Sequence, residues 1–275
     1  MFNVEIFQAL VLGIVQGASE FLPISSSGHL IIIPNVLGWE GLVNSLTFDV
    51  ALHLGTTVAV VGFFWKDWLK LFNSFFKTLP KGWKALWKES NSRMLILLGI
   101  GSVPAAFAGL VLEKTIESAF RSNLLVAANL IIFGLFLYWI DKQSKKARSE
   151  TSINLVDSIL VGIAQAAALF PGVSRSGITI SAGLFRNLDR ETATRFSFLL
   201  STPAILGASL LKLYDITAHF GGNSSVFIVG FLSAAVSGWF AIKVLLTYVR
   251  SNNFNVFVIY RIVLGVVILL LLARG

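Results

Sequence analysis

The chain has 275 residues, of which 55% are hydrophobic and only 13% are charged, and its mean hydropathy is +0.79. Ordinary soluble domains carry about 25% charged residues, so this composition excludes a disordered chain and argues against a soluble enzyme. Cysteine is absent, which excludes disulfides, thiolate catalysis and cysteine-ligated metals. The net charge of +8 does not indicate nucleic-acid binding, because the basic residues lie in loops between apolar segments, where membrane orientation accounts for them.

In chain order, six apolar segments approach the roughly 20 residues that a helix needs to cross a bilayer. They are residues 50–65, 94–112, 122–140, 196–211, 226–242 and 254–273. Two further apolar stretches, 2–37 and 155–185, are interrupted by Pro, Gly and Ser, which end helices. Broken helices at membrane depth are tolerated only inside protein or beside a wet cavity. We therefore expect an all-α integral membrane protein that forms one domain over residues 1–275.

The two interrupted stretches are copies of each other. When 13–28 is aligned with 162–177 without gaps, eight of sixteen positions are identical. This predicts two halves, 1–141 and 153–275, each with a re-entrant helix pair followed by three transmembrane helices, which makes six full spans. If the interrupted segments re-enter, the second half is inverted relative to the first. Inverted repeats with broken helices in matching positions are typical of a site near the midplane of the membrane.

The charges of the loops agree with this topology. Loops that it places on one side hold fifteen Lys and Arg residues, and those on the other side hold three. Cytoplasmic loops carry an excess of basic residues, so we expect the basic loops in the cytoplasm and both termini outside.

Ionisable groups within or between membrane spans are costly, and those that occur are functional candidates. Glu20, His29 and Arg175 lie in the repeated segments, and the other copy has Leu169, Ile178 and Ser26 at the matching positions. The scaffold is thus duplicated while the charges are not, which predicts a single asymmetric site built from both halves.

Three other ionisable residues of the apolar regions receive plainer interpretations. Asp49 and His53 precede or enter a span, and we interpret them as lining or structural residues. Arg261 is expected to extend its charged end to the cytoplasmic interface.

The first interrupted stretch offers groups for acid, base and anion chemistry. Gln16 and Glu20 are four residues apart and therefore share a helix face. A carboxylate beside an amide oxygen can hold Mg²⁺ or Ca²⁺ together with water and substrate phosphate, or it can act on a proton. The Ser25-Ser26-Ser27-Gly28 segment supplies hydroxyls, and a helix that begins there would direct free N–H groups at an anion. His29 follows as a candidate general acid or base.

The second stretch repeats the turn with a guanidinium. Ser174-Arg175-Ser176-Gly177 combines two hydroxyls with an Arg that is suited to bidentate phosphate contact. Together the two turns fit phosphoryl transfer, with an anion clamp, a proton carrier, a metal ligand and a hydroxyl nucleophile. The plain alternative is that these Ser and Gly residues serve close helix packing, with His29 as a hydrogen-bonded interior residue.

Residues 16–30, Gln-Gly-Ala-Ser-Glu-Phe-Leu-Pro-Ile-Ser-Ser-Ser-Gly-His-Leu, resemble the first signature of the bacterial undecaprenyl-pyrophosphate phosphatases of the bacitracin-resistance type. Residues 171–179, Pro-Gly-Val-Ser-Arg-Ser-Gly-Ile-Thr, resemble the second. The resemblance implies a hydrolase that converts undecaprenyl pyrophosphate to the monophosphate and phosphate, recycles the lipid carrier of cell-wall synthesis and gives bacitracin resistance. It also implies a multi-pass protein of the bacterial plasma membrane, a site open to the outer face, and a divalent cation, Mg²⁺ or Ca²⁺.

The resemblance also implies roles for matching residues. Glu20 would be the metal ligand or proton carrier, Ser26 or an activated water the nucleophile, His29 the acid/base partner and Arg175 the pyrophosphate clamp. Substrate contacts are expected from Gln16, Ser25, Ser27, Gly28, Ser174, Ser176, Gly177 and Thr179. Gln16 occupies a motif position that also takes Glu, so a metal site made of two carboxylates is not expected. The expected partners are the polyprenyl pyrophosphate and membrane lipids, with a homodimer as one option and no nucleic acid.

Transport is the rival class of function. Inverted repeats with broken helices are also typical of transporters, so such a fold could flip a lipid phosphate or move an anion. The one-sided placement of Glu20, Ser26 and His29 favours catalysis, because an anion path does not require it.

Overall fold

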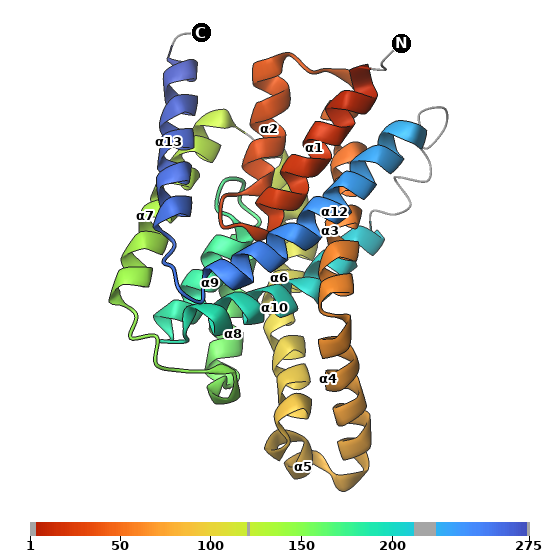
Figure 1. Ribbon diagram of the computed structural model, residues 1–275, viewed down its shortest axis with the longest axis vertical. Helices are drawn as coiled ribbons and strands as arrows, with labels where there is room; N and C mark the ends of the chain where they lie inside the picture. The colour runs from red at the N-terminus through yellow and green to blue at the C-terminus, as the bar shows by residue number, and fades with distance from the viewer. Residues whose placement is uncertain (1–3, 120–121, 212–223, 274–275) are drawn as a thin grey trace.

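A computed structural model describes residues 4–119, 122–211 and 224–273, with the side chains of 46, 113–119 and 208–211 left out (Figure 1). Within these ranges the regular elements are all helices, apart from an isolated β-bridge between Arg148 and Leu188. This confirms the all-α class. Helix α1 begins and α13 ends at one end of the molecule, and α5 lies at the opposite end (Figure 1).

The elements of residues 1–141 contain the first broken helix. They are α1 (Val4–Phe21), α2 (Ser26–Leu37), the short 3₁₀ helix η1 (Gly41–Asn44), α3 (Leu46–Phe63), α4 (Trp65–Thr78), η2 (Leu79–Lys81), α5 (Trp83–Lys88), α6 (Ser90–Ala119) and α7 (Asn123–Gln143). A second group follows η3 (Glu150–Ser152). It comprises α8 (Leu155–Ala167), α9 (Arg175–Phe185), α10 (Arg190–Leu211), α12 (Ser224–Tyr248) and α13 (Asn255–Leu272).

Five of the described helices are long and apolar enough to cross a membrane: α1, α6, α7, α12 and α13. Helices α3 and α4 meet the same criterion only as a pair, bent by 63°. Helix α1, expected as a short re-entrant element, is thus among the candidate spans, whereas α8 is a shorter apolar helix. The span expected at 196–211 lies in α10, which is not among the five.

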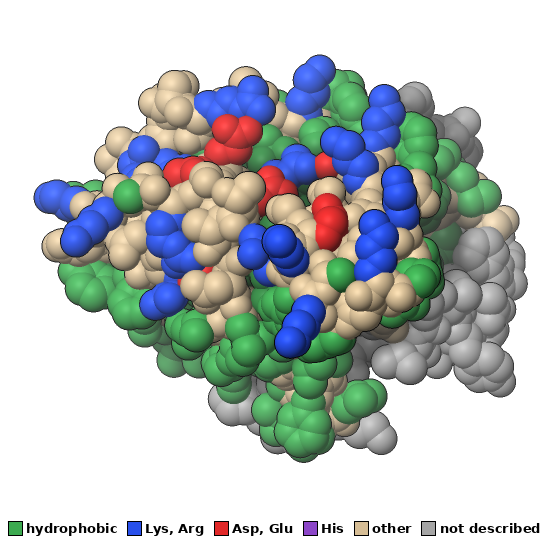
Figure 2. Space-filling view, turned by 90° about the horizontal axis from the view of Figure 1, so that it is seen from below, with side chains coloured by type: hydrophobic (Ala, Val, Ile, Leu, Met, Phe, Trp, Pro, Cys, Tyr) green, Lys and Arg blue, Asp and Glu red, His purple; other side chains and the backbone are tan. Residues whose placement is uncertain are grey.

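The surface agrees with a multi-pass membrane protein. Large apolar side chains such as Leu110, Phe107 and Val266 stand exposed on α6 and α13. Contiguous apolar surface of this kind is not left to water, so lipid covers it. Figure 2, which views the α5 end, shows Lys and Arg side chains gathered on that end.

The first helix of each interrupted pair, α1 or α8, packs against a helix from the other half of the chain. Helix α1 of the first group lies against α12 of the second, and α8 of the second lies against α6 of the first. Glycines permit both contacts: a Cβ at Gly13 would lie 2.6 Å from the carbonyl oxygen of Gly230, and one at Gly162 would collide with the carbonyl of Gly101. Small residues at membrane helix interfaces allow such close backbone approach.

Ion pairs hold the end of the molecule where α8 begins. Asp157 is fully buried and accepts hydrogen bonds from Arg148, at 2.5 and 2.9 Å, and from Arg186, at 2.7 Å. It also completes a capping box with Asn154. Burial alone would raise the pKa of Asp157, but these hydrogen bonds hold it below its ordinary value.

Candidate active site

The two repeated turns have the same backbone geometry. Ser25 has φ 75° and ψ 95°, and Ser174 has φ 71° and ψ 110°. Each is the N-cap of the helix that follows, and its hydroxyl oxygen accepts the backbone N–H of Gly28, at 3.4 Å, or Gly177, at 3.2 Å. A positive φ is unfavourable for Ser, so it persists only where the surroundings hold it. Because the same strained conformation occurs at the matching position of both copies, it is a specific feature of this turn and not an accident of one copy.

Hydroxyl pairs repeat as well. Ser25 and Ser27 lie 3.4 Å apart between their Oγ atoms, and Ser174 and Ser176 lie 3.3 Å apart. The identical residues of the repeat therefore build one local structure twice, and only the residues that differ set the chemistry of each turn.

Arg261 connects the two turns from inside the protein. Its side chain is fully buried on α13, and its guanidinium donates to five backbone carbonyls. The acceptors belong to the first turn, the second turn and α7: they are Pro23, Gly172, Val173, Asn129 and Leu130, at 2.9–3.3 Å. The expectation that Arg261 extends to the interface is therefore wrong, because unsatisfied turn carbonyls in the interior bind the guanidinium instead.

Glu20 and Arg175 bring the two halves of the chain into direct contact. Arg175 Nη2 lies 2.8 Å from Glu20 Oε1, and both side chains are largely buried. Glu20 stands in the last turn of α1, and Arg175 is the first residue of α9. The expected convergence of the two interrupted segments is present in the structure.

The second carboxylate oxygen of Glu20 accepts a hydrogen bond from the Ser26 hydroxyl of the first turn. Ser26 Oγ donates to Glu20 Oε2 at 2.6 Å, and Gln16 Nε2 donates to the same oxygen at 3.2 Å. His53 Nε2 lies 3.8 Å from it. A carboxylate that accepts a serine hydroxyl is positioned to take its proton.

His29 does not join this cluster through Ser26. Its Nδ1 lies 2.7 Å from the carbonyl oxygen of Ser25, and its Nε2 lies 2.6 Å from the hydroxyl of Tyr260. The imidazole and the phenol are also stacked, with ring planes 7° apart. Tyr260 was missed by sequence reasoning, and its only signal was its place beside Arg261 in an apolar helix.

Four of the residues that are expected to contact substrate have close neighbours within the protein. Thr179 Oγ1 donates to the carbonyl of Arg175 at 2.7 Å and pairs with Ser197, and Ser176 Oγ donates to the carbonyl of Leu22 at 3.0 Å. Thr179 and Ser176 are both fully buried. Gly177 and Gly28 leave room for neighbours: a Cβ there would lie 2.9 Å from Arg261 Nη1 and 3.3 Å from Val126, respectively.

Two buried atoms at the site have no hydrogen-bond partner among the residues that the structure describes. They are Gln16 Oε1, an acceptor, and Arg175 Nη1, a donor. Buried polar groups are almost always hydrogen-bonded, so these two atoms are available to a ligand. Arg175 Nη1 suits a phosphate oxygen.

A divalent cation fits this donor set only if substrate phosphate and water supply the remaining ligands. The described residues contain no group of three acidic, His or Cys side chains, so they form no closed metal cage. Glu20 and the free oxygen of Gln16 are two hard ligands, and Mg²⁺ is commonly held by one or two carboxylates with water and substrate phosphates.

Comparisons with known proteins agree over nearly the whole chain. The family model described as bacitracin resistance protein BacA matches residues 9–267. Among similar proteins, the undecaprenyl-diphosphatase of Thermodesulfovibrio yellowstonii is 47% identical over 97% of this chain and 97% of its own length. Those of Pelotomaculum thermopropionicum and Moorella thermoacetica are 47% and 48% identical over 98% and 96% of this chain, and over 97% and 96% of their own lengths. The chain therefore belongs to the BacA family of bacitracin resistance proteins.

Proposed function

We propose that this protein is an undecaprenyl-diphosphatase, which hydrolyses undecaprenyl pyrophosphate to undecaprenyl phosphate and phosphate. This reaction recycles the lipid carrier of cell-wall synthesis and gives resistance to bacitracin. The observation that carries the proposal is the meeting of Ser26 and Arg175, from opposite halves of the chain, on the two oxygens of Glu20. Relatives named for this activity cover nearly the whole chain, which supports it.

The geometry suggests how the reaction proceeds. Substrate phosphate enters beside Arg175, whose free Nη1 donates to it and whose charge offsets that of the pyrophosphate. Ser26 Oγ attacks the terminal phosphorus while Glu20 takes the hydroxyl proton, and the bond to the bridging oxygen breaks. Undecaprenyl phosphate leaves with the electron pair of that bond. Water then attacks the phosphoserine, which releases phosphate and restores Ser26.

His29 enters this scheme as a proton carrier through Tyr260. Both ring nitrogens are engaged, one by a backbone carbonyl and the other by the phenol hydroxyl. Because the Tyr260 hydroxyl lies 2.6 Å from His29 Nε2, a proton that passes between His29 and a ligand would go through this hydroxyl. Glu20, which already accepts the Ser26 hydroxyl, serves as the base for the attack.

Glu20 and Gln16 would hold a divalent cation, Mg²⁺ or Ca²⁺. Such an ion would offset the negative charge of the pyrophosphate when bound. Gln16 Nε2 meanwhile orients Glu20, since it donates to Oε2.

The topology is also a proposal. We infer one domain of two inverted halves, 1–141 and 153–275, with six spans in the bacterial plasma membrane and the site open to the outer face. The exchanged packing of α1 on α12 and of α8 on α6 supports the two-fold relation. The concentration of Lys and Arg at the α5 end, opposite the start of α1, supports the orientation (Figure 2). A homodimer stays a prediction, which the mass of the detergent-solubilised protein tests.

Phosphate release from a prenyl pyrophosphate in detergent tests the activity. Glu20→Ala and Arg175→Ala are expected to lose on the order of 10²-fold or more of the wild-type rate. Arg250→Ala is the matched control, because Arg250 is paired with Glu191 at the exposed surface. Full activity of either site variant would overturn the assignment. A parallel assay of lipid flipping in liposomes separates a phosphatase from a lipid-phosphate transporter.

A further inference from the structure

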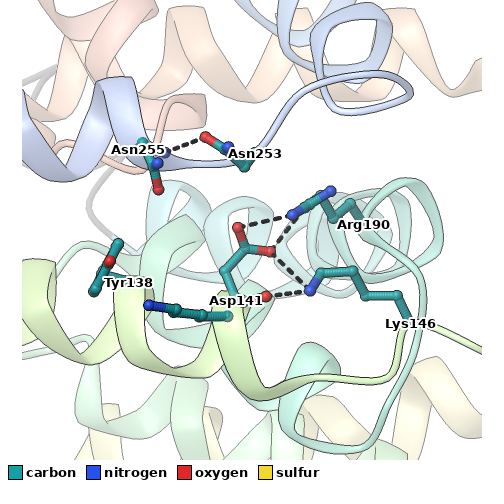
Figure 3. A pocket seen from close by; sticks show the side chains of 7 residues that line it. Tyr138, Asp141, Lys146, Arg190, Asn253 and Asn255 are labelled. Atoms are coloured by element: carbon teal, nitrogen blue, oxygen red, sulfur yellow. Dashed lines mark hydrogen bonds and ion pairs between the residues drawn. The ribbon is translucent and has the colours of Figure 1, made fainter.

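A polar pocket, lined by none of the residues of the Glu20–Arg175 cluster, lies where the C-terminal end of α7 meets the start of α13 (Figure 3). Its volume is about 330 Å³. The residues that line it are Tyr138, Asp141, Lys142, Lys146, Arg190, Asn253 and Asn255. None of them has a role in the proposed reaction.

The pocket carries an excess of positive charge. Three basic side chains face one carboxylate, which leaves two positive charges. Asp141 is already engaged, because Arg190 donates to both of its oxygens, at 2.7 and 3.1 Å, and Lys146 lies 3.6 Å from one of them. Figure 3 shows the Asp141 carboxylate facing both of these cations. The ammonium of the third cation, Lys142, lies 5.8 Å from the ring centre of Tyr138, which also lines the pocket.

The pocket opens where a lipid headgroup would lie. Helices α7 and α13 pack against each other, and both are candidate spans, so their shared end marks one edge of the membrane. Tyr138 and Trp139 are exposed there, and such aromatic side chains are typical of the membrane–water interface. Exposed apolar residues of α13, including Val256 and Ile259, continue from the pocket along the membrane face.

We propose that this pocket binds the phosphate of an anionic phospholipid, with the acyl chains along the exposed apolar surface of α7 and α13. Basic pockets between transmembrane helices on the cytoplasmic side bind such headgroups. Lys142 supplies the free charge, Lys146 and Arg190 supply donors already held in place by Asp141, and the amides of Asn253 and Asn255 are further donors. The apolar surface beside the pocket selects a lipid over free phosphate.

Lipid binding to the purified full chain tests the proposal. Native mass spectrometry after exposure to vesicles of phosphatidylglycerol or phosphatidylcholine counts the lipids that stay bound. The wild-type protein is expected to retain phosphatidylglycerol preferentially, and Lys142→Gln and Lys146→Gln are each expected to weaken this retention about fivefold, because a Lys near an anionic surface contributes about 1 kcal/mol. Lys243→Gln is the matched control: Lys243 lies 5.6 Å from the ring centre of Trp239 on α12, in the same kind of contact but outside the pocket.

Four outcomes would overturn the proposal. They are no preference for phosphatidylglycerol, an equal loss of binding in Lys142→Gln and Lys243→Gln, unchanged retention in both pocket variants, and binding of inorganic phosphate alone that depends on Lys142. Phosphate release shows that each variant is folded, and Lys142→Gln is expected to keep the wild-type rate. Loss of the lipid with retained activity supports a headgroup site that is independent of catalysis.

Discussion

The turn at Ser25 and the turn at Ser174 have nearly the same backbone and opposite chemistry. Both have a strained serine at the N-cap, a serine–serine pair and a glycine whose N–H binds the capping hydroxyl. The first turn, however, presents Ser26 to Glu20, and the second presents Arg175 to the same carboxylate. In the proposed reaction the two copies of this turn therefore have different roles: the first supplies the nucleophile, and the second supplies the positive charge that binds the phosphate.

The largest expected effect separates the serines of the two turns. Ser26→Ala removes the hydroxyl that Glu20 accepts, and we expect phosphate release to fall on the order of 10³-fold or more. Ser176→Ala removes a hydroxyl that donates to the carbonyl of Leu22, and we expect a loss of less than about tenfold. Steady-state phosphate release measures both. Equal losses would mean that the two turns do not divide the chemistry.

The next effect concerns the residue that holds the two turns together. Arg261→Met leaves turn carbonyls without a donor, and each buried unsatisfied group costs about 1–3 kcal/mol, so the free energy of unfolding should fall by several kcal/mol. Thermal unfolding in detergent measures the loss. Arg250→Met, at an exposed ion pair, is the control and should change stability by less than about 1 kcal/mol. Similar stability of the two variants would contradict the role assigned to Arg261.

The exchanged packing of the broken helices gives a third comparison. Gly162→Ala places a methyl group against the carbonyl of Gly101, and overpacking of this kind costs about 1–3 kcal/mol. Gly109→Ala, where a Cβ would meet no atom of the described residues within 4 Å, should be neutral or slightly stabilising. Unfolding midpoints of the two variants test whether α8 and α6 approach as closely as the structure has them.

A smaller effect is expected at the pair formed by His29 and Tyr260. Tyr260→Phe removes the hydroxyl bound to His29 Nε2 but keeps the stacked ring. We expect the rate of phosphate release to fall about tenfold, which corresponds to the loss of one hydrogen bond worth about 1.4 kcal/mol. His29→Gln in the Tyr260→Phe background should add little. If the two effects multiply instead, His29 and Tyr260 act separately.

The smallest effect distinguishes the starts of the two broken helices. Asp157 at the start of α8 has a pKa below its ordinary value, whereas the matching position in α1 is Gln8. Stability from Asp157 is therefore complete above the ordinary aspartate pKa of about 3.9 and is lost as the pH falls through the lower folded value. Unfolding midpoints between neutral and acidic pH should fall less steeply in Asp157→Asn, although that variant starts from lower stability. If the unfolding midpoints of the wild type and of Asp157→Asn fell equally steeply with pH, the stabilising role of the Asp157 carboxylate would be contradicted.

Sequence reasoning located both turns because identity at matching positions reports a repeated local structure directly. It also predicted that Glu20 and Arg175 lie together, since single charges in two copies of one scaffold indicate a shared site. It could not set the rotation of α13, which depends on the close contact of Arg261 with Gly134 on α7. For that reason Tyr260 was missed and Arg261 was misplaced. The inward direction of Thr179 likewise depends on Ser197 of α10, a partner that no spacing within the motif reveals.

A double-mutant cycle on Glu20 and Arg175 tests most directly whether the two turns act as one catalytic unit. Phosphate release is measured for Glu20→Gln, Arg175→Gln and the variant with both changes. Residues that work as a unit are strongly non-additive, so the double variant should be about as slow as the worse single variant. If the two losses multiply instead, each turn contributes on its own, and the contact between Glu20 and Arg175 has no part in catalysis.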